Sequence, residues 1–202
     1  MNIAGLLISF GLLIIAMTVH EFAHGWVANK LGDPTAKYSG RLTLNPLAHI
    51  DPLGTIILPL ALFIATSGRF VFGAAKPVPI NYWSLKNPKR DIILVGAAGP
   101  LANFVLAFIL SLLWRVLPLS TIWDFILKNL IFINVILGVF NLLPIPPLDG
   151  SRILMGLLPA SLADKYSRLE PYGFIIIIVL ISLGVFDVLI EPLVRIILSW
   201  IF

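Results

Sequence analysis

Two histidines and a glutamate stand together at the end of a long apolar stretch, in the order His20-Glu21-Phe22-Ala23-His24. If this stretch is a helix, His20 and His24 lie one turn apart on the same face. Two imidazoles in that arrangement can fill two positions of a tetrahedral zinc ion. Glu21 follows the first histidine and can act as the general base that activates water. The spacing therefore predicts a zinc site that carries out hydrolysis.

The composition places this motif in a membrane protein. Of the 202 residues, 59% are hydrophobic and 12% are charged, whereas soluble domains carry about 25% charged residues. The mean hydropathy is +1.01. The sequence has no cysteine, which excludes a disulfide, a cysteine zinc site and a thiol nucleophile. In such a protein, the net charge of +4 concerns the orientation of the chain in the lipid bilayer, not nucleic-acid binding.

Long apolar stretches predict an all-α polytopic membrane protein with about four transmembrane helices. The predicted helices cover residues 2–30, 91–118, 122–143 and 172–190. A further apolar segment, residues 52–67, contains Pro59 and is shorter than the roughly 20 residues that a crossing helix needs. We expect this segment to be re-entrant, so that it enters and leaves the membrane on the same side.

Two short stretches with alternating side chains, residues 41–44 and 69–72, predict short membrane-associated strands. The sequence contains no internal repeat and no low-complexity segment. We therefore interpret residues 1–202 as a single integral-membrane domain. Its catalytic core covers about residues 1–150, and residues 151–202 supply C-terminal helices.

Asp149 is the favoured third zinc ligand. It stands in the stretch LLPIPPLDG, directly after the third predicted membrane helix. The prolines forbid a regular helix there, and irregular backbone at membrane depth is stable only where protein or a water-filled cavity covers it. An Asp-Gly pair is also a common turn. A carboxylate beside such a break nevertheless fits the missing ligand.

His49 and Asp51 are the other candidates near the site. Both belong to the polar stretch of residues 39–51, which does not resemble a membrane segment. The simpler interpretation is that these side chains form hydrogen bonds within a loop. We keep His49 as the alternative metal ligand.

Basic residues indicate which side of the membrane holds the site. Seven of the 14 lysines and arginines lie at or after the end of the first predicted helix or shortly before the second, and they are Lys30, Lys37, Arg41, Lys76, Lys86, Lys89 and Arg90. Cytoplasmic loops carry an excess of lysine and arginine. His24 is near the same end of its helix, so we expect a multi-pass protein of the cell membrane with its active site toward the cytoplasmic side. A re-entrant course for residues 52–67 also keeps Asp149 on that side.

Asn103 is a polar residue inside the second predicted membrane helix, whose stretch GAAGPLAN provides a face of small residues for close helix packing. An asparagine in that position needs a hydrogen-bond partner. A bond between helices and a contact with substrate are both open interpretations.

These motifs together resemble the site-2 protease family of intramembrane zinc metalloproteases. HEFAH on the first helix and NLLPIPPLDG after the third carry the resemblance most specifically. GRLTLNPLAHIDPLG, AKPVPIN and AGPLAN extend it over nearly the whole chain. They are typical of the compact prokaryotic branch, which lacks the PDZ and CBS domains of larger relatives.

The resemblance implies a role for each site residue. It implies that His20, His24 and Asp149 hold one Zn²⁺ per chain and that Glu21 activates water. It also implies that Asn141 helps to bind substrate or the developing oxyanion. The implied substrate is a transmembrane protein, which is cleaved within or near the lipid bilayer.

A membrane zinc-binding or zinc-transport protein without proteolytic activity is the alternative. A transporter should place polar residues through the bilayer as a pathway, whereas here they cluster toward one side. Glu21 also has no evident role in transport. These features favour proteolysis, and the sequence leaves a homo-oligomer open.

Overall fold

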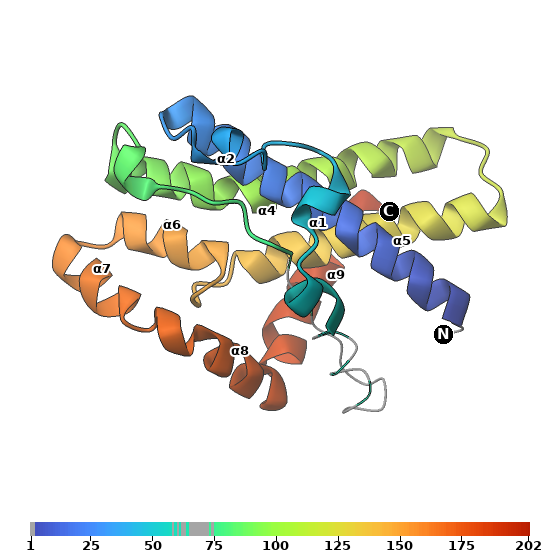
Figure 1. Ribbon diagram of the computed structural model, residues 1–202. Helices are drawn as coiled ribbons and strands as arrows, with labels where there is room; N and C mark the ends of the chain where they lie inside the picture. Colours follow the sequence, from blue (N-terminus) through green and yellow to red (C-terminus); the bar gives the residue numbers. More distant parts are fainter. Residues whose placement is uncertain (1–2, 58, 60, 62–63, 65–72, 74) are drawn as a thin grey trace.

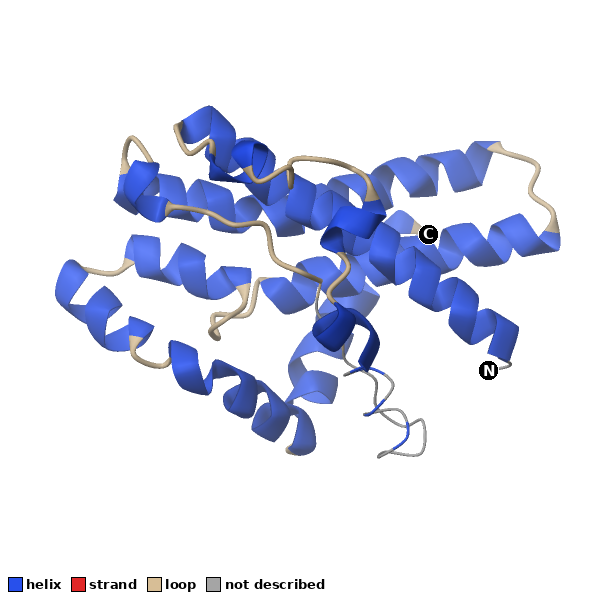
Figure 2. Ribbon diagram, in the orientation of Figure 1, coloured by secondary structure: helices blue, strands red, loops and turns tan. Residues whose placement is uncertain are grey.

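The chain folds into a bundle of helices (Figures 1 and 2). The computed structural model describes residues 3–57, 59, 61, 64, 73 and 75–202, and within these residues there is no β-strand. Three long helices form its centre. They are α1 (Ile3–Leu31), α4 (Pro88–Val116) and α5 (Thr121–Asn141). Each is long and apolar enough to cross a membrane, and their bounds confirm the first three predicted helices to within a few residues.

Shorter helices connect and flank this centre. After α1 come α2 (Thr35–Tyr38), the 3-10 helix η1 (Pro46–His49), the π-helix η2 (Pro52–Ile57) and the 3-10 helix η3 (Tyr82–Ser84). After α5 come α6 (Asp149–Leu157), α7 (Ala160–Ser167), η4 (Glu170–Tyr172), α8 (Gly173–Ser182), η5 (Phe186–Ile190) and α9 (Glu191–Ile201).

The fourth predicted membrane helix is broken. The prediction of one continuous helix over residues 172–190 is wrong, because α8 ends at Ser182 and the chain bends by 76° before α9. Gly184 has a φ of 74°, which is the left-handed conformation that glycine adopts without steric cost. The described chain therefore has three helices that can span a membrane, or four if the bent pair is one span.

The predicted strand at residues 41–44 is also wrong. Thr43 uses its carbonyl to accept a hydrogen bond from the ring of His49, and its hydroxyl accepts one from the backbone of Asn45. The backbone thus bonds to side chains instead of a neighbouring strand. The predicted strand at residues 69–72 lies outside the described residues, and so do residues 58, 60, 62–63 and 65–67 of the predicted re-entrant segment, residues 52–67.

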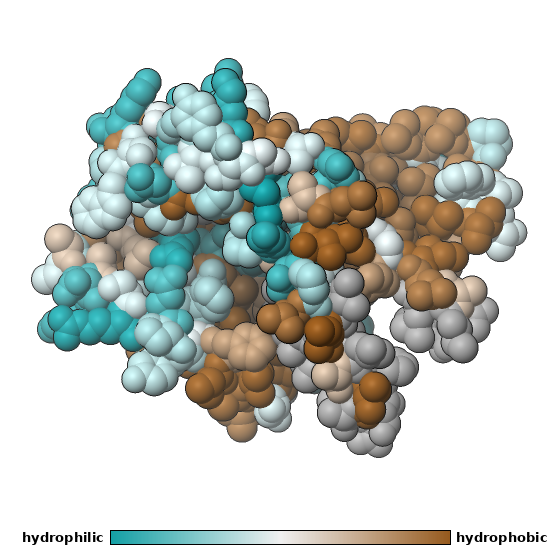
Figure 3. Space-filling model, viewed as in Figure 1, coloured by the Kyte–Doolittle hydropathy of each residue, from teal (hydrophilic) through white to brown (hydrophobic). Residues whose placement is uncertain are grey.

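The surface is apolar along the long helices and polar at one end. Many large apolar side chains of α4 are exposed, including Leu101, Val105 and Phe108. In Figure 3, hydrophilic residues gather over the end that holds α2 and α7, and apolar residues cover the middle of the bundle. Such a wide apolar surface is what contact with lipid tails requires.

Close packing brings α6 against α4. A Cβ atom on Gly96 of α4 would lie 3.1 Å from the backbone oxygen of Asp149. At the other end of α6, a Cβ atom on Gly156 would lie 2.8 Å from the carbonyl oxygen of Lys89. Both glycines therefore let the two helix backbones approach closely. The packing fixes Asp149, the first residue of α6, beside the middle of the bundle.

Candidate active site

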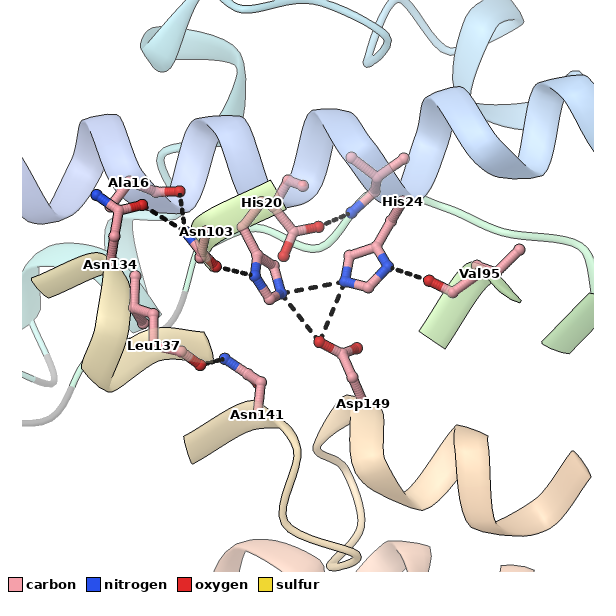
Figure 4. Close-up of polar contacts among 11 residues, drawn as sticks. Ala16, His20, His24, Val95, Asn103, Asn134, Leu137, Asn141 and Asp149 are labelled. Carbon is pink, nitrogen blue, oxygen red and sulfur yellow. Dashed lines mark hydrogen bonds and ion pairs between the residues drawn. The ribbon is translucent and has the colours of Figure 1, made fainter. Parts of the chain in front are cut away.

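Three side chains from two helices meet inside the bundle, as Figure 4 shows. His20 and His24 project from the same face of α1, and Asp149 projects from the start of α6. The two histidines are buried, with 7% and 6% of their surface exposed. One ligand atom from each of the three residues lies within 4.8 Å of the other two. The spacing of the two histidines and the folding back of α6 thus bring together three metal-ligand types.

The three candidate ligand atoms are nearly equidistant. The Nε2 atoms of His20 and His24 are 3.0 Å apart. Asp149 Oδ2 lies 3.0 Å from the first and 3.2 Å from the second. Bonds of 2.0–2.1 Å to a tetrahedral zinc ion would place ligand atoms about 3.3 Å apart. The spacing therefore fits a zinc ion that contacts all three atoms.

The hydrogen-bond partner of Nδ1 determines which nitrogen of each imidazole carries the proton. His20 Nδ1 lies 2.6 Å from Asn103 Oδ1, and His24 Nδ1 lies 2.7 Å from the carbonyl oxygen of Val95. Both partners are acceptors, so each Nδ1 carries the proton and donates it. Each Nε2 then has a lone pair, which points toward the other Nε2 and the carboxylate. Three electron-pair donors in contact repel one another unless a cation lies between them, and this chemistry fits Zn²⁺.

The carboxyl group of Asp149 is ionised at neutral pH. Burial raises its pKa, but positive charge on the facing imidazoles of His20 and His24 outweighs burial and lowers the pKa to about 2, and a cation held among the three groups favours the ionised form in the same way. The helix that begins at Asp149 is itself held in place by Arg152, which pairs with Glu170 and lies 5.7 Å from the ring centroid of Tyr82. The anionic form is the one that binds a metal ion.

Gly99 of α4 leaves the space that the imidazoles occupy. A Cβ atom at this position would lie 2.3 Å from His24 Nε2 and 2.6 Å from His20 Nε2. No side chain fits there without displacing the histidines. The small-residue face of α4 therefore makes room for the candidate metal site as well as for helix packing.

Glu21 is held by a backbone amide from the short stretch of residues 77–79. Its Oε2 accepts a hydrogen bond of 2.8 Å from the N–H of Val78. Pro77 and Pro79 flank Val78 and have no N–H group. Val78 is thus the only residue of this short stretch that can orient Glu21 by its backbone.

A cavity of about 480 Å³ opens beside these residues. His20, Glu21 and Asn141 supply its polar wall. The apolar walls come mainly from α1, α5 and α8, through Leu13, Met17, Ile136, Leu137, Phe140, Phe174, Ile177 and Ile181. The C-terminal helices therefore close one side of the cavity, even though the candidate ligands all belong to residues 1–150.

Comparisons with known proteins agree with this geometry. Residues 8–129 and 118–184 match the family described as Peptidase family M50. The protein named "Putative zinc metalloprotease YwhC" of Bacillus subtilis (strain 168) is 43% identical over 177 residues, which cover 83% of this chain and 77% of that protein. The chain belongs to Peptidase family M50.

Other members of this family are more distant. "Putative zinc metalloprotease Rip2" of Mycolicibacterium smegmatis is 34% identical over 170 residues, which cover 83% of this chain and 64% of the relative. "Regulator of sigma-E protease RseP" of Escherichia coli (strain K12) is 30% identical over 115 residues, or 52% of this chain and 24% of the relative. No solved structure matches the chain.

The family confirms the predicted resemblance to the site-2 proteases. This M50 peptidase is an intramembrane zinc metalloprotease, and zinc transport without proteolysis is not favoured. The cofactor is Zn²⁺, for which the cluster of His20, His24 and Asp149 has suitable donors.

Asn103 and Asn141 of the M50 peptidase lie in different surroundings. Asn103 is fully buried, and its amide nitrogen donates to Ala16 O and Asn134 Oδ1 while its oxygen contacts His20. This geometry favours a bond between helices over a contact with substrate. Asn141 lines the cavity and donates one amide hydrogen to the carbonyl of Leu137, at 3.0 Å.

His49 lies outside the described metal cluster. Its Nε2 donates to the carbonyl of Thr43 at 2.9 Å, so that nitrogen is already used in the loop. Asp51 likewise accepts a hydrogen bond from the backbone of Gly54. Sequence reasoning did not single out Val78, Val95 or Asn134, because backbone groups leave no side-chain signal and a lone asparagine leaves a weak one.

We expect Gly99→Ala to lose zinc, because the new methyl group would occupy the position of the two imidazoles. Zinc content per purified chain, measured by atomic emission, should fall well below one. Gly11→Ala is the matched control, since a Cβ atom there meets nothing within 4 Å. Equal zinc content in the two variants would contradict the proximity of Gly99 to the metal site.

The third ligand can be tested by exchanging the two candidates. Asp149→Ala should lose most of the bound zinc, because it leaves only two protein ligands for the ion. His49→Ala should retain it, because the imidazole bonds to Thr43. Zinc analysis of both variants decides the matter, and the opposite result would make His49 the ligand.

Proposed function

We propose that His20, His24 and Asp149 bind the catalytic zinc ion and that Glu21 is the general base for peptide-bond hydrolysis. The observation that carries this proposal is the convergence of three electron-pair donors, 3.0–3.2 Å apart, beside a cavity that Glu21 also lines. Two histidines and one carboxylate are a common ligand set of catalytic zinc sites.

The bound ion would polarise the scissile carbonyl and lower the pKa of water toward neutrality. Glu21 takes the proton from the attacking water and returns it to the leaving amine. Its Oε2 accepts the N–H of Val78, so the carboxylate has a fixed orientation and its other oxygen serves the proton transfer. Asn141 donates an amide hydrogen to the substrate carbonyl as negative charge develops there.

The substrate of this protease is a transmembrane protein. The family acts on membrane-protein substrates within the bilayer, and the apolar walls of the cavity fit an apolar segment. A transmembrane helix hides its peptide bonds in internal hydrogen bonds. The substrate therefore has to unwind locally before its peptide bond reaches Glu21 and the ligands.

The protease is oriented in the cell membrane with its active site toward the cytoplasm. Exposed cations at the C-terminal end of α1, in the segment that joins α1 to α4 and at the start of α4 form no ion pair with a carboxylate in the described part of the chain. These cations are Lys30, Lys37, Lys76, Lys86, Lys89 and Arg90. The neighbouring acids Asp33 and Asp91 are buried. The excess of exposed positive charge supports a cytoplasmic location for this end.

Glu21→Gln should keep its zinc and lose proteolysis, because an amide cannot take the proton from water. Cleavage should fall by at least about 100-fold, the lower range for the loss of a general base. The measurement compares membrane-protein fragments in cells that express the wild type or the variant, together with zinc content. Asp164→Asn, which changes an exposed acid outside the site, should cleave as the wild type does. Wild-type cleavage by Glu21→Gln would show that another group is the base.

Single cysteines can test the orientation, because the chain has no native cysteine. Ser39→Cys and Ser84→Cys should resist a membrane-impermeant thiol reagent in intact cells and react after the cells are opened. Ser120→Cys, an exposed position between α4 and α5 at the other end of these helices, should react in intact cells. The reverse labelling pattern would contradict a cytoplasmic active site.

A further inference from the structure

Asn134 of α5 is a fully buried polar residue two contacts away from the candidate metal site. Its Oδ1 accepts a hydrogen bond of 2.8 Å from Asn103 Nδ2, and its own Nδ2 donates to the carbonyl of Leu130 at 2.8 Å. Asn103 Oδ1 in turn contacts His20 Nδ1 at 2.6 Å. A chain of hydrogen bonds therefore runs from α5 through α4 to α1 (Figure 4).

Each carboxamide in this chain has a defined orientation. Asn134 presents its oxygen to Asn103, because its nitrogen is used by the carbonyl of Leu130. Asn103 presents its nitrogen to Asn134 and to the carbonyl of Ala16. The contact with Ala16 is longer, at 3.2 Å, than the 2.8 Å bond to Asn134. In addition, Ala16 is four residues before His20, so its carbonyl is also the helical acceptor for that residue.

The orientation of Asn103 decides which nitrogen of His20 is available to a metal ion. With the oxygen of Asn103 facing Nδ1, the proton resides on Nδ1 and the Nε2 lone pair points toward Asp149. A rotated carboxamide would instead present its NH₂ group to Nδ1. The imidazole proton would then sit on Nε2 and occupy the position of the metal ion.

We propose that Asn134 is a positioning residue for the zinc site. By accepting a hydrogen bond from Asn103, it holds that carboxamide in the one orientation that keeps the Nε2 lone pair of His20 free for zinc. The inference rests on the proposed role of His20 as a ligand. Outer partners of metal-binding histidines affect affinity in this way, because they set the tautomer and the angle of the ring.

Zinc affinity in a chelator competition with the purified protein tests the proposal. Asn134→Leu has a similar volume but no acceptor, and it should bind zinc about 10-fold more weakly or worse, as expected for the loss of an outer partner. Asn134→Asp should bind zinc as the wild type does, because a buried neutral carboxylic acid retains both the acceptor oxygen and a donor for Leu130.

Asn129→Leu is the matched control. Asn129 is on the same helix and makes the same kind of bond, from Nδ2 to the carbonyl of Phe125 at 2.8 Å, but it is only partly buried and is not hydrogen-bonded to Asn103. This variant should bind zinc with wild-type affinity. Equal affinity of Asn134→Leu and Asn129→Leu would overturn the proposal.

A second pair of variants separates orientation from packing. In Asn103→Asp, a carboxylate has only acceptor oxygens, so it accepts the Nδ1 proton of His20 in either orientation. Adding Asn134→Leu to Asn103→Asp should then cost little further zinc affinity. A loss as large as that caused by Asn134→Leu in the wild type would show that Asn134 acts through packing, and the proposal would fail.

The same assay separates this inference from the proposed zinc site. Asp149→Ala should lose zinc whether or not Asn134 positions Asn103. If Asp149→Ala loses zinc while Asn134→Leu binds it normally, only the role of Asn134 is wrong. If Asp149→Ala and His20→Ala both bind zinc normally, the proposed site itself is wrong, and the inference fails with it.

Discussion

Electrostatic repulsion among three lone pairs is the constraint on which the rest of this structure depends. The Nε2 atoms of His20 and His24 and the Oδ2 atom of Asp149 lie 3.0–3.2 Å apart in a buried place. Such contacts are unfavourable at low dielectric unless a cation joins them. The bundle supplies what the arrangement needs: acceptors for both Nδ1 protons, a glycine opposite the rings, and a helix that starts at the carboxylate. The same residues therefore determine both how the helices pack and how the candidate ligands are arranged.

The motif residues and the three long helices could be predicted from the sequence. The i, i+4 spacing of His20 and His24 sets their common face without reference to the rest of the chain. Asp149 could be inferred because prolines next to an apolar segment demand a covered, irregular backbone. Local rules were sufficient in these places, because each conclusion depends on a few neighbouring residues.

Other features could not be predicted, because they depend on contacts between distant segments. The amide of Val78 reaches Glu21 across 57 positions of the chain, and the carbonyl of Val95 reaches His24 across 71. The break after Ser182 depends on a bend at Gly184 that apolar composition does not reveal. The supposed strand at residues 41–44 shows the same limit, since alternation of side chains does not supply a partner strand.

The separation of the candidate ligands along the chain has a consequence for biosynthesis. His24 and Asp149 are 125 positions apart, so the ribosome makes both histidines long before the carboxylate. A growing chain holds only an incomplete pair of imidazoles until its third long helix and the start of α6 have been made. With His20, His24 and Asp149 as the proposed ligands, the zinc site is complete only after Asp149 has been made. By then the three long helices α1, α4 and α5 have been made, whereas α8, which closes one side of the cavity, has still to follow.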